Sequence, residues 1–147
     1  MTSYLEVISL DQAKLYLKID TLQTETDDEI TSMINSSLSF IEKRTGHHFK
    51  TKNKTFYGQD TVTVYDYPIV DAPLNTQVRQ TNSIVPTIDG SVILELGYVS
   101  LDDIPNELID AALQIIKVWF FESEKQENTT LIPLSVMQAI DANRRFI

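Results

Sequence analysis

The sequence predicts a mainly α (α+β) fold, in which a compact bundle of about four helices carries a small antiparallel β element between its second and third main helices. Apolar residues recur with a helical period in residues 9–46 and 104–147, whereas residues 54–100 are rich in β-branched and aromatic residues, punctuated by glycine and proline. A length of 147 residues suits one domain, so we assign residues 1–147 to a single domain.

The first helix is predicted in ISLDQAKLYLKI, close to the N-terminus. Ser9 can cap it, and Gln12 stands three residues later, where it completes a capping box. Ile8 can pack onto Ala13 as a hydrophobic staple. We expect this helix to be short and to end near Asp20.

The second helix is expected to begin at a capping box of Thr26 and Glu29 and to end at Gly46, because glycine readily takes the left-handed conformation that closes a helix. Its apolar residues fall on one side of a helical wheel, so this helix should cover a core with one face. These residues are Ile30, Met33, Ile34, Leu38, Phe40 and Ile41.

Both histidines of the chain, His47 and His48, follow this helix directly in RTGHHFK. They could form a metal site, a catalytic pair or the exit of the helix. Adjacent strand residues point to opposite faces, and the sequence contains no cysteine and no HxH or HxxxH spacing. We therefore interpret them as hydrogen-bonded histidines at a helix exit, and we expect neither a metal nor a cofactor.

The middle of the chain contains the predicted strands or hairpin arms, in FYGQDTVTVYDYPI (residues 56–69) and SVILELGYV (residues 91–99). Between them, LNTQVRQTNS (residues 74–83) has no clear pattern and is expected to be a loop. Such a loop is either mobile or suited to a partner.

The third helix is expected to start at Pro105 and to continue through LIDAALQIIKVWFFE. Its apolar residues occupy an arc of roughly 220°, about twice the stripe of an ordinary surface helix. This helix could simply be the central one of the domain, or another subunit could cover one flank, and the two interpretations are compatible. The candidates for a subunit interface are Leu113, Val118 and Phe121.

A last helix is predicted in LIPLSVMQAIDANRRFI, capped by Ser135 and carrying Val136, Met137 and Ile140 on its apolar side. The chain then closes with Arg144, Arg145, Phe146 and Ile147, a compact basic and apolar group. This group is either a fraying helix end, with its arginines matched to the helix dipole, or a docking tail.

Charge and missing motifs narrow the classes of function. A net charge of −9 disfavours tight binding to nucleic acid. The start MTSYLEVISLDQAK has neither the basic flank nor the apolar run of a signal peptide, so we expect a soluble protein made in a cytoplasm. The sequence has no phosphate-binding glycine loop, GxSxG or HExxH. The acid pairs Asp27–Asp28 and Asp102–Asp103 stand at predicted helix starts, so we expect no enzyme.

The order of these features resembles the head-tail connector (adaptor, or head completion) family of long-tailed bacteriophages. The resemblance is carried by ISLDQAKLYLKID, DDEITSMINSSLSFIEKRTGHHF, DYPIVD, LGY before IPNELIDAALQIIKVWFFE, and IPLSVMQAI. It covers nearly the whole chain. Two segments depart from the family pattern. One is FFESEK, which follows Trp119, and the other is the loop from Leu74 to Val85, which is longer and more polar than the strand pair usual in the family.

The resemblance implies a non-catalytic structural protein of the virion neck, assembled in the host cytoplasm and bound to no membrane. It implies a ring, generally a dodecamer, that sits beneath the portal protein, carries a downstream stopper or tail-completion protein, and extends a channel through which double-stranded genomic DNA passes without sequence-specific binding. The C-terminal part would contact the portal, here through residues 144–147, whose deletion should weaken portal binding and leave the fold intact.

Two other classes remain open. One is a tail-completion or interaction module that does not form a portal-bound ring, since it would share the composition and the helices. The other is an enzyme, such as a hydrolase using unpaired carboxylates, although no nucleophile and base can be named from the spacing.

Overall fold

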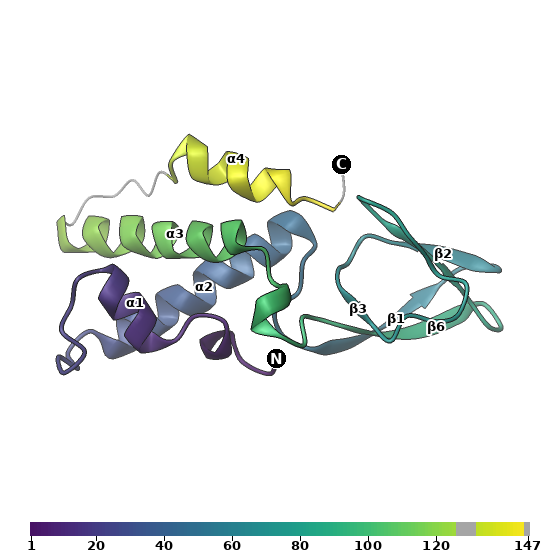
Figure 1. Ribbon diagram of the computed structural model, residues 1–147, viewed down its shortest axis with the longest axis horizontal. Coiled ribbons are helices and arrows are strands. Elements are labelled where there is room, and N and C mark those ends of the chain that lie inside the picture. The colour runs from purple at the N-terminus through teal and green to yellow at the C-terminus, as the bar shows by residue number, and fades with distance from the viewer. Residues whose placement is uncertain (126–131, 146–147) are drawn as a thin grey trace.

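The computed structural model describes residues 1–125 and 132–145, and Figure 1 shows an elongated molecule with its helices at one end and its strands at the other. The helices are α1 (Leu10–Tyr16), α2 (Asp27–Thr45), α3 (Asn106–Lys125) and α4 (Leu134–Ala142). Short 3-10 turns, η1 (Tyr4–Glu6) and η2 (Leu101–Asp103), precede α1 and α3.

The strands form two three-stranded antiparallel sheets. The first sheet has the order β1-β6-β3, with β1 (Lys52–Tyr57), β6 (Ser91–Leu96) and β3 (Ile69–Val70). The second has the order β2-β5-β4, with β2 (Thr61–Val64), β5 (Ser83–Pro86) and β4 (Gln77–Val78). Both sheets contribute to one small core, formed by Val64, Val85, Leu94 and Leu96.

The prediction of a mainly α bundle with a small β element is therefore wrong, because the described residues form a mixed α+β fold. The segment 74–83, expected to be a loop, contains β4 and the start of β5. Gln77 pairs with Ile84, and Thr63 pairs with the same residue from the other side. A strand that depends on pairing with a distant segment leaves little local pattern in the sequence.

A second core fills the helical part, where α2 packs against α1, α3 and α4. The apolar side predicted for α2 is largely confirmed, because Ile30, Ile34, Leu38 and Ile41 are fully buried. The wide apolar arc of α3 also has an internal explanation, since α1, α2 and α4 all pack around this helix. In Figure 1, α4 lies along α3 on the side away from α1.

The predicted helix ends are only partly right. The Ser9 hydroxyl accepts a hydrogen bond from the Gln12 backbone N–H at 3.1 Å, and Gly46 closes α2 with φ of 83°, so these two predictions are confirmed. The first helix ends at Tyr16, before the expected Asp20. Thr26 is the N-cap residue of α2, as predicted, but among the described contacts its side chain makes no capping hydrogen bond. The prediction of Ser135 as a cap is wrong, because α4 begins at Leu134 and Ser135 lies inside it.

Gly97, directly after β6, lies close to the backbone of the segment that enters β1. It has φ of +122°, and a Cβ built on it would lie 2.8 Å from the Lys50 carbonyl oxygen. We expect Gly97→Ala to lower the free energy of unfolding by about 3 kcal/mol, because both backbone strain and the clash must be relieved. Denaturant titration of the variant measures this loss.

Gly90 provides a matched control, since its φ is also positive at +84° but a Cβ there would meet no atom within 4 Å. Gly90→Ala should therefore show the conformational cost alone, about 1 kcal/mol. Equal losses at the two glycines would contradict the close approach at Gly97.

Candidate assembly surfaces

The segment after α4, Asn143–Arg145, connects the helical part to the sheets. The Arg145 backbone N–H donates to the Thr45 carbonyl at 2.7 Å. Its guanidinium donates to the carbonyls of Arg79 at 3.0 Å and Gln80 at 2.7 Å, and lies 4.6 Å from the centre of the Tyr67 ring. One residue therefore joins the end of α2 to the turn between β4 and β5.

Arg145 is only 6% exposed, and burial lowers the pKa of its guanidinium. Its carbonyl contacts lie within the chain, so they hold the fold together instead of reaching a partner. Arg144 is exposed, and the predicted contacts Phe146 and Ile147 lie outside the described residues. Deleting residues 144–147 would also remove Arg145 and these contacts, so we now expect the deletion to lower the stability of the fold as well as portal binding.

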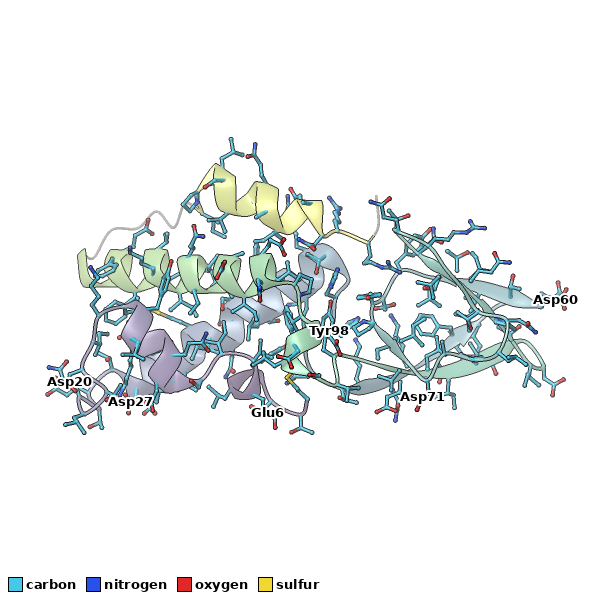
Figure 2. All side chains as sticks on the ribbon, in the orientation of Figure 1. Glu6, Asp20, Asp27, Asp60, Asp71 and Tyr98 are labelled. Atoms are coloured by element: carbon cyan, nitrogen blue, oxygen red, sulfur yellow. The ribbon has the colours of Figure 1, made fainter. Side chains whose placement is uncertain are left out.

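His47 lies buried at the same junction, where Figure 2 labels Tyr98. Its Nε2 is 2.8 Å from the Asn143 carbonyl oxygen, which can only accept, so this nitrogen carries the proton. Its Nδ1, 2.7 Å from the Tyr98 hydroxyl, then accepts from that group. His48 contacts a different partner, with Nε2 2.6 Å from Asp66 Oδ1, so the prediction of hydrogen-bonded histidines at a helix exit is confirmed.

Burial lowers the pKa of His47 from 6.5 to about 4; the hydrogen bond to Asn143 opposes this shift and the nearby Arg145 charge adds to it. The unfolded chain therefore binds a proton at a pH where the folded chain does not. Stability should fall as the pH drops from 6.5, by roughly 3 kcal/mol at pH 4. Denaturant titrations of wild type and His47→Gln across this window measure the effect, and an equally steep pH dependence in both proteins would contradict it.

The candidate interface residues on α3 separate into two groups. Leu113 is buried in the helical core, so it is not available to a second subunit. Val118 is partly buried, and Phe121 is 37% exposed with its ring edge-on to Phe120 at 5.7 Å between centroids. Val118 and Phe121 therefore remain the interface candidates on this helix.

The paired acids stand at helix starts, as predicted. Asp27 and Asp28 open α2, and Asp27 forms an ion pair with Lys14. Asp102 lies in η2, where its backbone N–H donates to the Ser100 hydroxyl at 3.2 Å.

Across residues 1–125 and 132–145, no three His, Asp or Glu side chains are grouped to hold a metal ion. Over the same residues, no helix has the length and apolar character needed to cross a membrane.

A basic groove is the feature that the sequence reasoning missed. It consists of two hollows beside α2 and η1 that share Tyr4, Ser39, Lys43 and Lys50 in their lining. Lys52, His48 and the one acidic residue, Glu42, line the first of them as well. The sequence signal lies in residues 43–54, which contain five basic residues and no acidic one in a chain of net charge −9. Because these lysines are split between the end of α2 and the start of β1, only the fold shows that they line one surface.

Comparisons with known proteins identify the fold. Neither protein-family models nor curated proteins match the sequence. A chain in the virion of the native gene transfer agent (GTA) particle aligns with a TM-score of 0.68 and 12% identity, over 98% of this chain and 92% of that chain. A chain in the neck of the empty GTA particle, computed with C6 symmetry, aligns with a TM-score of 0.70 and 16% identity, over 98% and 93%. Over nearly its whole length, this protein therefore has the fold of chains that occur in GTA particles.

Proposed function

We propose that this protein is a structural component of a virion neck, an adaptor ring that joins the capsid portal to the next connector or tail component and extends the DNA channel. The observation that carries the proposal is the shared fold with a chain in the neck of the GTA particle, which extends over 98% of this chain. That neck was computed with C6 symmetry, which rings of six and of twelve copies both obey. We propose a dodecamer, the ring that the resemblance to head-tail connectors implies.

The charge of the chain suits a conduit for DNA. Contacts to phosphate dominate the affinity of proteins for duplex DNA, so a wall with few such contacts lets the duplex slide. With a net charge of −9, most of the protein surface should repel the phosphates of DNA. The genome would pass through the ring without sequence-specific binding.

The C-terminal residues are the proposed contact with the portal protein. Arg145 fixes the chain at the junction, and the exposed Arg144 directly precedes it. Phe146 and Ile147 are the apolar residues of this proposed contact. An arginine beside apolar side chains is a common combination at the centre of protein interfaces.

Arg144→Ala combined with removal of residues 146 and 147 should weaken portal binding by about tenfold or more, because both the charged and apolar contacts are lost. The fold should survive, since Arg145 is retained. Co-sedimentation with the portal measures binding, and thermal unfolding checks the fold. Lys18→Ala, a change of an exposed basic residue in the helical part, is the control. Portal binding equal to wild type in the truncated variant would refute this contact.

The mass of the portal complex separates an adaptor ring from a tail-completion or interaction module that forms no ring. We expect native mass spectrometry of the portal mixed with this protein to show addition of a complete ring, twelve copies for a dodecamer. A complex that gains one or a few copies, in no fixed ring number, would favour the second class.

A further inference from the structure

The basic groove combines an apolar side, formed by Phe40 and Trp119, with the exposed lysines Lys43, Lys50 and Lys52. The Glu42 carboxylate also lines the groove, where it accepts hydrogen bonds from the Tyr4 hydroxyl and the Phe49 backbone N–H. Lys50 Nζ lies 4.5 Å from the centre of the Tyr4 ring. Such a groove suits an apolar side chain accompanied by carboxylates.

A segment of the same chain has this chemistry. The acidic loop, residues 20–29, comprises the loop before α2 and the first three residues of that helix, and it contains five acidic residues and no basic one. Its Leu22 is 86% exposed, so this apolar side chain is available to a partner. Figure 2 labels Asp20 and Asp27 of this loop at the helical end of the molecule, far from the sheets. Asp60 is labelled at the opposite end, in the sheets.

The acidic loop is held in place from beneath by Lys14, a buried lysine on α1. Its Nζ donates to the Gln23 carbonyl at 2.6 Å and the Thr21 carbonyl at 3.3 Å, and it forms an ion pair with Asp27. Asp20 Oδ1 also accepts from the Leu22 backbone N–H at 3.0 Å. These contacts order the loop with Leu22 at its exposed surface, which lowers the entropy lost on docking.

We propose that the acidic loop of one copy docks into the basic groove of the next copy, with Leu22 against the apolar side and Glu25 near Lys50. The proposal rests on the ring of the proposed function. A ring requires two different complementary patches on each subunit, and the loop and the groove are two such patches. The loop and groove have opposite charge, so their contact also gives the ring its direction.

Disulfide trapping tests this contact cleanly, because the chain contains no cysteine. Leu22→Cys and Ser39→Cys are made in separate chains of different mass, mixed with portal protein and oxidised. We expect a crosslinked heterodimer, and a double variant carrying both changes should give a ladder of oligomers. Thr55→Cys, at an exposed position on β1, replaces Ser39→Cys in the control pair and should give no heterodimer.

Charge exchange tests the same contact without a crosslink. Lys50→Glu should weaken ring formation on the portal by about tenfold, and adding Glu25→Lys to the same chain should restore most of it. Duplex DNA is titrated against wild type and Lys50→Glu in parallel. DNA binding that Lys50→Glu abolishes would overturn the proposal by giving the groove to nucleic acid.

Electron microscopy of the crosslinking samples distinguishes a failure of the docking proposal from a failure of the proposed adaptor function. Rings that form on the portal without the 22–39 crosslink, or with equal crosslinking at Thr55→Cys, would overturn the docking proposal and leave the adaptor function standing. Absence of any ring on the portal would overturn the adaptor function itself, and the docking proposal with it.

Discussion

Replacing Arg145 with alanine is expected to lower the free energy of unfolding by about 3 kcal/mol, because charged hydrogen bonds to two backbone carbonyls are lost together. The carbonyls of Arg79 and Gln80 would lose their guanidinium donor, and the Tyr67 ring would lose the cation above it. The turn between β4 and β5 would then be less firmly attached to the helical part.

Urea titration measures the stability of the Arg145→Ala variant, and hydrogen exchange in residues 79–83 reports the attachment of the turn. Arg145→Lys keeps the charge but lacks the planar guanidinium whose N–H groups reach both carbonyls. It should therefore recover only part of the lost stability. Arg144→Ala is the neighbouring control and should change stability by less than about 0.5 kcal/mol, as exposed substitutions usually do. A loss at Arg145 no larger than at Arg144 would contradict the role assigned to it.

Lys14→Met should also cost about 3 kcal/mol, because it leaves Asp27 and two loop carbonyls without the ammonium group while retaining most of the aliphatic stem. Lys14 is 1% exposed, so its ammonium group makes these contacts shielded from bulk solvent. The acidic loop should become mobile, and ring formation should weaken along with it.

Chemical denaturation measures this loss, and hydrogen exchange across residues 20–26 measures the order of the loop. Lys18→Met on the exposed side of the same region is the matched control and should leave both unchanged. In a double-mutant cycle, Asp27→Asn should cost much less in the Lys14→Met background than in wild type. Additive losses would show that the two residues do not act together.

The helices could be predicted from the sequence because their information is local. The apolar period in α2, the cap at Ser9 and the close at Gly46 each depend on residues within a few positions of one another. The start of the last helix is less certain from sequence, since Pro133 and not Ser135 takes the cap position, and helix ends are the least locally determined part of a helix.

The strands around residue 80 could not be predicted in the same way. Gln77 and Val78 are exposed in β4, so no alternation of apolar and polar residues marks them. Their position is set by pairing with Ile84 and Ser83, and Arg145 holds the neighbouring turn from the far end of the chain. Information spread over more than sixty residues has no short sequence signature.

The candidate surfaces show the same division. Arg144 and Arg145 are adjacent in sequence and equivalent in chemistry, yet one is exposed and the other is buried between two parts of the fold. The sequence predicts Leu113 and Phe121 alike as interface residues, because both lie on an apolar helix. In the fold, the helices packed around α3 cover Leu113. The residues of the basic groove are visible in the sequence as a charge anomaly, and the fold is needed to assemble them.

Electron cryo-microscopy of this protein bound to its portal tests the adaptor ring most directly. We predict a closed ring of twelve copies, coaxial with the portal, with an open channel and with the C-terminal segment of each copy against the portal. The acidic loop of each copy should lie in the basic groove of its neighbour. A portal that binds this protein as separate copies without a closed ring, or a ring whose axis is blocked or displaced from that of the portal, would contradict the account.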